Sequence, residues 1–326
     1  MRKLSCRFSL AALWTGLQAL ALALTLVSPA GAQQYSDWSA PVNLGYPVNS
    51  SFADQNPVIS RDGLTLYFSS DRPGGFGGLD IWVARRASAD DPWGTPQNLG
   101  PNINTPYTDN SPALSPDGRQ LIFFSNRPGA FGDTDIYVSR RRHKRDDLGW
   151  GPAQNLGSGV NTSYSERGPE YFRNPKTGII TLYFNSNRPG GKGGNDIYAS
   201  TLQPDGTFGP AVLVEELNSP ADDQALAIRR DGLELIIASN REGTLGGLDL
   251  FVATRASTSK PWSTPVHLGP VLNSADVEAG VALSFRGTAL YFHSGRLGGL
   301  GLFDIYMSTR SKLKEPDDDE DEDEDD

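Results

Sequence analysis

The feature that most constrains this chain is a sequence repeat that occurs five times. An aromatic residue followed closely by proline marks each copy, and the spacing between successive markers is nearly constant. Self-similarity at a nearly fixed period is typical of propellers, solenoids and other repeat architectures. The five markers are Trp38, Trp93, Trp150, Phe208 and Trp262.

Each copy continues with an Asn-Ser or Asn-Thr pair and an acidic residue five places after the asparagine. A short apolar run and a turn follow, and three of the turns contain Asp-Gly. Asp-Gly between two β-like runs is a strong hairpin signal, because glycine tolerates the positive φ that such turns require. The acidic residues are Asp54, Asp109, Glu166, Asp223 and Glu278.

An alternating strand comes next and leads into a glycine-rich Ser-x-Arg loop. Its arginines are Arg72, Arg127, Arg188, Arg241 and Arg296. Eight positions after every arginine stands an aspartate that opens another strand, at Asp80, Asp135, Asp196, Asp249 and Asp304. The same interval is kept in all five copies.

Four strand candidates per copy are the content of one propeller blade. The sequence therefore predicts an all-β fold, a five-bladed β-propeller of four-stranded antiparallel blades. The chain opens on the strand type that ends a copy, at 38–44, and its last strand is of the third type, at 304–309. We expect 38–44 to complete the last blade, which would join the chain ends and remove an exposed sheet edge.

The repeat resembles the PD40 family, also described as WD40-like or TolB-like. The resemblance rests on the Pro-Asp-Gly turn at 116–118, the Leu-Tyr-Phe strands, the Ser-Asn-Arg-Pro-Gly-Gly loop at 186–191 and the Asp-Ile-Tyr strands. It covers residues 38–310 and is specific for the fold. Similarity to TolB-like proteins implies protein–protein contacts in the cell envelope.

The segment 1–32 has the pattern of a secretory signal, with a basic start, an apolar stretch and Ala30-Gly31-Ala32 at the expected cleavage site. We expect a signal peptide at 1–32, the propeller at 33–312 and a disordered acidic tail at 313–326. The mature protein would be periplasmic or secreted, with no membrane span. It would have no disulfides, because Cys6 is the only cysteine.

Charge is unevenly distributed along the chain. The net charge is −10, and the segment 317–326 consists entirely of Asp and Glu. Nucleic acid is therefore not an expected partner. The tail either solubilises the protein or contacts a basic partner or divalent cations. The basic loop at 140–145 (Arg-Arg-Arg-His-Lys-Arg) is either a solvated loop or an anion contact.

The recurrent arginine and acids should lie on one face of the ring. One interpretation is structural, with each arginine tying loops together through one or both acids. The other is a polar ring that binds a peptide, a glycan or a cation. Calcium suits such oxygen ligands, but no calcium-binding spacing occurs, so we predict no metal site and no cofactor.

The sequence contains no recognisable catalytic cluster. The three histidines, His143, His267 and His293, are scattered, and no nucleophile-elbow serine or zinc-helix pair is present. We therefore expect a non-enzymatic binding or scaffolding propeller with a protein or peptide partner, or a glycan. The alternative is a hydrolase acting on a carbohydrate or a lactone with channel carboxylates. A carboxylate pocket that breaks the fivefold pattern would favour the alternative.

Overall fold

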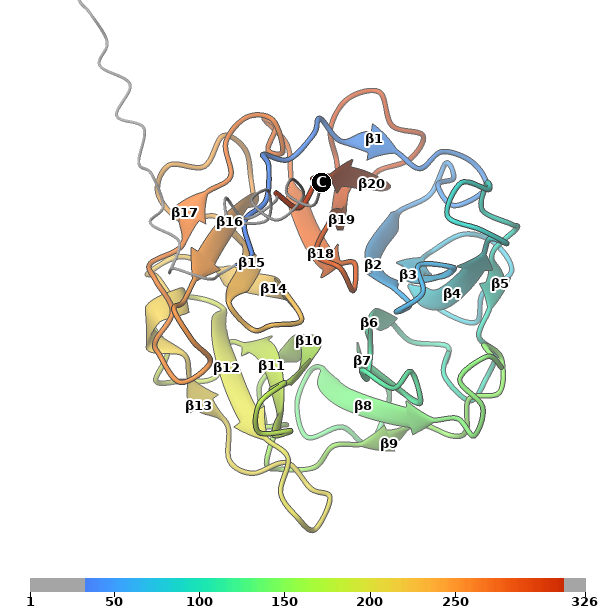
Figure 1. Ribbon diagram of the computed structural model, residues 1–326. Helices are drawn as coiled ribbons and strands as arrows, with labels where there is room; N and C mark the ends of the chain where they lie inside the picture. The colour runs from blue at the N-terminus through green and yellow to red at the C-terminus, as the bar shows by residue number, and fades with distance from the viewer. Residues whose placement is uncertain (1–32, 314–326) are drawn as a thin grey trace, which may run out of the picture. The chain divides into compact units, whose positions relative to one another are not determined.

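The computed structural model describes residues 33–313. Five four-stranded antiparallel sheets stand around a central axis in these residues (Figure 1). The predicted five-bladed all-β propeller is confirmed. The predicted signal at 1–32 and nearly all of the acidic tail lie outside the described residues, and so does Cys6.

The blades are numbered in chain order, and their strands are given from the innermost to the outermost. Blade 1 contains β2 (Asp54–Ile59), β3 (Thr65–Ser70), β4 (Asp80–Arg85) and β5 (Gln97–Asn98). Blade 2 contains β6 (Asp109–Leu114), β7 (Gln120–Ser125), β8 (Asp135–Arg140) and β9 (Gln154–Asn155). Blade 3 contains β10 (Glu166–Arg173), β11 (Ile180–Ser186), β12 (Asp196–Thr201) and β13 (Val212–Leu213), followed by the 3-10 turn η1 (Glu215–Leu217). Blade 4 contains β14 (Asp223–Ile228), β15 (Glu234–Ser239), β16 (Asp249–Thr254) and β17 (Val266–His267). Blade 5 contains β18 (Glu278–Leu283), β19 (Ala289–Ser294), β20 (Asp304–Thr309) and β1 (Val42–Asn43).

Blade 5 is completed by the first strand of the chain, as the order of the repeat predicts. Strand β1 pairs antiparallel with β20, with Val42 opposite Met307 and Asn43 opposite Tyr306. Figure 1 shows this blue strand beside the red end of the chain. The ring is thus closed by backbone hydrogen bonds between segments from opposite ends of the propeller sequence.

The hydrophobic core is divided among the blade-to-blade interfaces. Each of five buried clusters contains residues from two neighbouring blades. The second strands are central to this packing, and every residue of β3 is buried. Because such strands are covered on both sides, they are continuously apolar at their centres and not strictly alternating.

The outermost strands are shorter than the sequence predicts. Each contains two residues, and the aromatic marker lies before the strand. In four blades it stacks on an arginine that follows the third strand of the same blade, as Arg141 stacks on Trp150 with 4.3 Å between guanidinium carbon and ring centroid. In blade 3 the marker Phe208 packs edge-on against Tyr171 instead. In blade 5 the pair crosses the closure, since Arg310 lies 4.2 Å from the ring of Trp38.

The innermost strands share a β-bulge that was not predicted from the sequence. At the third position of each strand the φ angle is between 42° and 58°, and pairing with the second strand shifts there. A bulge locally kinks the strand and releases ladder groups. All five bulge residues line the central channel; they are Asn56, Ser111, Gly168, Ala225 and Gly280.

Candidate functional site

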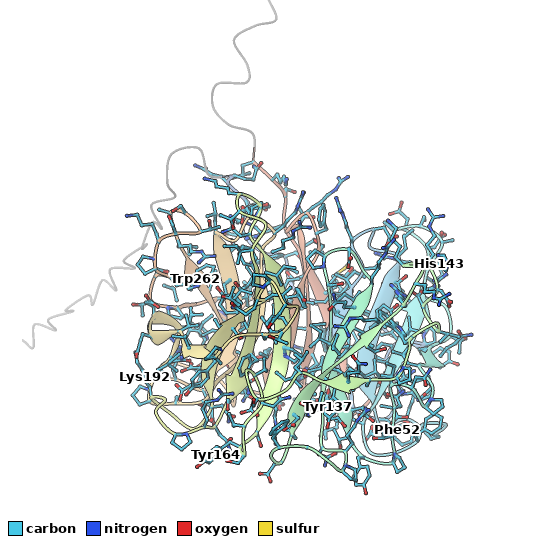
Figure 2. The ribbon with its side chains drawn as sticks, turned by 90° about the horizontal axis from the view of Figure 1, so that it is seen from below. Phe52, Tyr137, His143, Tyr164, Lys192 and Trp262 are labelled. Carbon is cyan, nitrogen blue, oxygen red and sulfur yellow. The ribbon has the colours of Figure 1, made fainter. Side chains whose placement is uncertain are left out.

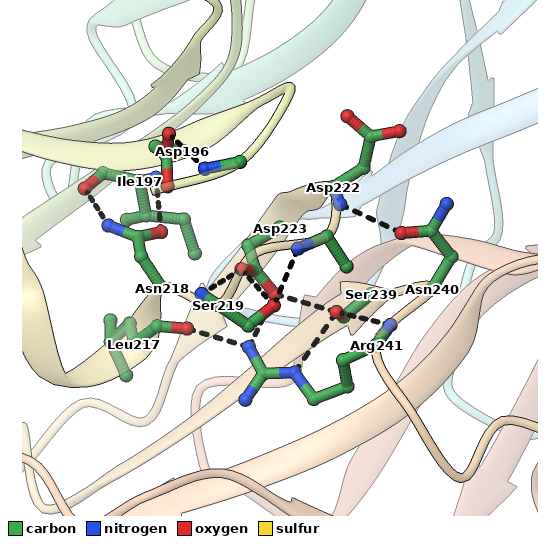
Figure 3. A network of polar contacts seen from close by, with 12 residues as sticks. Asp196, Ile197, Leu217, Asn218, Ser219, Asp222, Asp223, Ser239, Asn240 and Arg241 are labelled. Carbon is green, nitrogen blue, oxygen red and sulfur yellow. Dashed lines mark hydrogen bonds and ion pairs between the residues drawn. The ribbon is translucent and has the colours of Figure 1, made fainter. Parts of the chain in front are cut away.

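Each recurrent arginine forms a buried ion pair with the acid that opens the innermost strand of its blade. We call this ion pair, with the hydrogen bonds around it, a tie. In blade 2, Arg127 Nη2 donates to Asp109 Oδ1 and to the carbonyl of Ile103, each at 2.6 Å. Arg127 Nε donates to Ser125 Oγ at 3.0 Å. Figure 3 shows the same tie in blade 4, where Arg241 contacts Asp223, Ser239 and the Leu217 carbonyl.

The same pairing holds around the ring. The remaining pairs are Arg72 with Asp54, Arg188 with Glu166 and Arg296 with Glu278. The side chains of all five acids are fully buried, and those of the arginines are nearly so. A buried carboxylate needs such a partner, because an unpaired buried charge is strongly destabilising. The ties hold the loops around them; whether they also bind a ligand stays a prediction.

The aspartates that open the third strands do not contact these arginines. Asp135 Oδ2 instead accepts hydrogen bonds from Phe131 N–H at 2.8 Å and from Asn155 Nδ2 at 2.6 Å. Asp80, Asp196, Asp249 and Asp304 cap their own glycine-rich loops in the same way. Each arginine thus contacts the acid that opens the innermost strand and not the aspartate that opens the third strand.

Two faces of the ring can now be distinguished. The loop face carries the arginine–acid ties and the glycine-rich loops, such as 71–79. The turn face carries the Asp-Gly turns and the basic loop at 140–145. In Figure 2, Phe52 and Tyr164 lie along one side of the disc and His143 lies towards the other. His143 is exposed, and Arg141 is paired with Asp147 at 2.6 Å.

The central channel contains a narrow cavity of about 30 Å³ between the five innermost strands. That is room for about one or two water molecules. Asparagine, serine, proline and small apolar residues make up most of its wall. One acidic residue, Glu170, lines it among the residues that the structure describes.

Glu170 departs from the fivefold pattern. The position four places after the acid of each innermost strand holds Val58, Ala113, Ala227 and Ala282 in the other blades. The Glu170 carboxylate reaches towards blade 4, where Ile228 N–H lies 3.4 Å from its Oε1. Burial is the largest influence on this group and raises its pKa to about 8, although backbone hydrogen bonds lower it. The carboxyl is therefore mostly protonated at neutral pH.

His293 also departs from the pattern and is buried against the bulge of blade 1. Its Nδ1 accepts a hydrogen bond from Asn56 N–H at 3.2 Å. Burial lowers its pKa to about 3, so the ring stays neutral at physiological pH. A Cβ on Gly280 would lie 2.4 Å from that Nδ1, which explains the glycine. His293 fits a structural acceptor, and Glu170 is the group suited to proton transfer.

Glu170 was not predicted from the sequence, because only residues that recur were considered as site candidates. Aligning the five copies of the repeat reveals Glu170, because it is the one glutamate in a column of small apolar residues. What the sequence could not show is that Glu170 lines the channel, because the bulges set the direction of these side chains. Among residues 33–313 no group of three or more His, Cys, Asp or Glu side chains could hold a metal ion.

Comparisons with known proteins support the architecture. No protein-family model matches the chain, and no curated protein matches it. Several solved structures are similar to the chain. An α-L-arabinofuranosidase from Lactobacillus brevis shares 15% identity at a TM-score of 0.57, over 84% of this chain and 94% of that one. The GH43_1 enzyme from Xanthomonas citri complexed with xylotriose shares 16% at a TM-score of 0.55, over 85% and 91%.

A third neighbour is the catalytic domain of the Coprinopsis cinerea GH62 α-L-arabinofuranosidase. It shares 11% identity at a TM-score of 0.54, over 87% of this chain and 100% of that one. At these identities the likeness establishes the fold alone. The PD40 resemblance stays a prediction, since no family model matches.

These neighbours correct the functional expectation from the sequence. A non-enzymatic binding or scaffolding propeller was expected, but the similar structures are glycoside hydrolases by name. The expectation was wrong because it treated the recurrent polar residues as the only candidate site residues. These residues are paired with one another in the ties. The carboxylate that breaks the pattern is Glu170.

Proposed function

We propose that this chain is a hydrolase that acts on carbohydrates, with Glu170 as its general acid. The observation that carries the proposal is a single channel carboxyl whose pKa is raised to about 8 by burial. A carboxylic acid that is still protonated at neutral pH can donate a proton to the leaving oxygen of a glycosidic bond.

The narrowness of the cavity sets where the sugar lies. A volume of about 30 Å³ admits water but no sugar ring. The sugar therefore occupies the channel mouth, and Glu170 reaches the glycosidic oxygen directly or through one channel water.

One carboxyl suffices for a balanced reaction. Glu170 gives its proton to the leaving oxygen as the C–O bond breaks, through an oxocarbenium-like transition state. Water forms the new C–O bond, and its proton returns to the Glu170 carboxylate. One glycosidic bond and one water yield two hydroxyl products, and the acid is regenerated.

The test is turnover by the purified protein on a panel of aryl glycosides, oligosaccharides and lactones, with products identified by mass spectrometry. Glu170→Gln should lower turnover by about 10²–10⁴-fold, the usual contribution of a general acid. The rate of the unmodified protein should fall above about pH 8, as Glu170 ionises. Glu242→Gln, which changes an exposed carboxylate, is the matched control. Absence of turnover on every substrate, or full activity of Glu170→Gln, would refute the proposal.

We also propose that the protein acts in the periplasm or outside the cell, following the signal predicted at 1–32, and that its repeats are of the PD40 type. Support comes from the sequence patterns alone. Among the described residues, no helix is long and apolar enough to cross a membrane. The proposed activity requires a glycan as partner. A protein partner is a second candidate, and binding experiments with oligosaccharides distinguish the two.

A further inference from the structure

Five exposed aromatic side chains occupy corresponding positions on the loop face of neighbouring blades. Their exposed fractions lie between 38% and 53%. Phe76 and Phe131 each stand four places after a tie arginine, and the others each stand two places before a tie acid. We name this set the aromatic crescent; it consists of Phe52, Phe76, Tyr107, Phe131 and Tyr164.

The crescent is built in pairs at the junctions between blades. The loop that carries Phe76 lies against the connection that carries Tyr107, and Gly78 N–H donates to the Tyr107 carbonyl at 3.1 Å. A Cβ on Gly77 would lie 2.3 Å from that carbonyl oxygen. Because only glycine allows this approach, the sequence places Phe76 and Tyr107 on adjoining loops.

The next junctions repeat the arrangement. A Cβ on Gly132, beside Phe131, would lie 1.8 Å from the Tyr164 carbonyl oxygen. A Cβ on Gly301, beside Leu300, would lie equally close to the Phe52 carbonyl oxygen. Three consecutive junctions thus carry exposed apolar pairs: blades 5 and 1, blades 1 and 2, and blades 2 and 3.

The remaining two junctions interrupt the pattern. Lys192 and Ala221 adjoin at blades 3 and 4, and Leu245 and Asp276 adjoin at blades 4 and 5. Lys192 is itself paired with Glu215 at 3.1 Å. The aromatic side chains therefore follow about half of the ring. An arc that breaks the fivefold symmetry of its own scaffold is unlike an architectural feature, which would recur in every blade.

Both junctions that pair two aromatic rings also present an amide. Asn126 Oδ1 accepts from Thr108 N–H at 2.8 Å, and Asn187 Oδ1 accepts from Ser165 N–H at 2.9 Å. Both asparagines are exposed, and neither amide nitrogen donates to another group of residues 33–313. These Nδ2 groups are free donors beside Tyr107 and Tyr164. Asn240 accepts from Asp222 N–H in the same way at 2.8 Å, so the amides recur in three blades and the aromatic rings alone define the arc.

We infer that the aromatic crescent binds an extended neutral glycan chain. A pyranose ring has an apolar C–H face, which packs on an aromatic ring, and hydroxyls at its rim, which accept hydrogen bonds from amides. The alternation of aromatic pairs with free amides along an arc matches both features of successive sugar units. A protein partner would call for one contiguous apolar centre, and here polar connections separate the pairs. The inference rests on the proposed carbohydrate function. It specifies that the substrate of the propeller is an extended oligosaccharide chain.

The test is isothermal titration calorimetry with linear β-1,4-linked xylo-oligosaccharides of increasing length. Glu170→Gln protein is used so that turnover is slow during the titration. Affinity should rise with chain length until the arc is spanned. Tyr107→Ala, Phe131→Ala and Tyr164→Ala should each weaken binding of the longer oligosaccharides by about two- to tenfold, the range expected for a lost aromatic contact. Leu245→Ala, which truncates the corresponding loop position outside the arc, should bind as the parent does.

The outcomes separate this inference from the proposed activity. Binding through the crescent, together with unchanged turnover by Glu170→Gln, would refute the role of Glu170 and leave the crescent intact. Equal affinity of the aromatic variants and the parent would overturn the crescent, and so would absence of binding to every oligosaccharide. If the variants instead changed self-association in light scattering and left glycan binding unaltered, the surface would be a protein interface and the inference would be wrong.

Discussion

At the scale of single residues, position in the fold decides which of the many acidic side chains can do chemistry. The acids of the ties are buried but paired with arginine, as Asp109 is with Arg127. Glu170 lies in the channel wall, and within residues 33–313 no cation lowers its pKa, so burial dominates and the pKa rises. Among these carboxyls, Glu170 combines an accessible cavity with a proton to give at neutral pH.

The raised pKa of Glu170 has a consequence for stability. A glutamate ionises near pH 4.5 in the unfolded chain, and near 8 here. Between these values the folded state holds a proton that the unfolded state has lost, so stability falls as pH rises through this window. Glu170→Gln should remove this decline and be more stable than the parent at pH 8.

The measurement is the midpoint of urea unfolding from pH 5 to pH 9, for the parent, Glu170→Gln and the control Glu242→Gln. Parallel curves for the parent and Glu170→Gln would show that Glu170 has an ordinary pKa in the folded protein. A curve that flattens only in Glu170→Gln would support the raised value.

At the scale of elements, the tie makes each glycine-rich loop part of its blade. The arginine links the second strand, the connection before the innermost strand and the acid that opens it. In blade 2 these groups are Ser125, Ile103 and Asp109, all bonded to Arg127. The loops of the crescent are anchored in turn by the third-strand aspartates, since Asp135 accepts the N–H of Phe131. Fixed loops can present aromatic rings at low entropic cost.

Removing the acid of one tie should therefore destabilise the whole ring. Asp109→Ala leaves the Arg127 guanidinium and the Thr105 N–H and hydroxyl without their partner. We expect a loss of about 3–5 kcal/mol in the free energy of unfolding, as for other broken buried charge pairs. Asp133→Ala, which removes an exposed acid on the same face, should change it little. Chemical denaturation of both variants gives the comparison, and equal stabilities would contradict the structural role.

At the scale of the whole molecule, stability depends on closing the ring. Besides the β1–β20 pairing, Ser39 N–H donates to the Thr309 carbonyl at 2.8 Å and Ser36 N–H to the Ser311 carbonyl at 2.9 Å. Arg310 is held between Trp38 and Tyr35 on one side and Glu234 of blade 4 on the other. The first residues of the fold thus connect blades 4 and 5.

Deleting residues 38–45 should sharply lower the melting temperature, because it exposes an edge of blade 5 and removes Trp38 from its cluster. Trp38→Ala is a milder variant that keeps the strand, and we expect it to lower the melting temperature by about 5–10 °C. Differential scanning calorimetry measures both. Melting curves that match the parent in both variants would show that closure does not stabilise the ring.

The repeat by itself determined the fold class, the number of blades and the permuted closure. The order and spacing of the strands can be read directly from the repeat, and a propeller buries the same residue pattern in every blade. The repeat also predicted that each arginine could pair with one or both acids, and the structure decided that the partner is the acid that opens the innermost strand. The tertiary structure decided which residues face the channel, because the bulges at positions such as Gly168 reset the alternation of the innermost strands. It also decided that burial raises the pKa of Glu170 and that five aromatic side chains form one arc. Burial and the meeting of loops from neighbouring blades are properties of the closed ring, and no single copy of the repeat contains them.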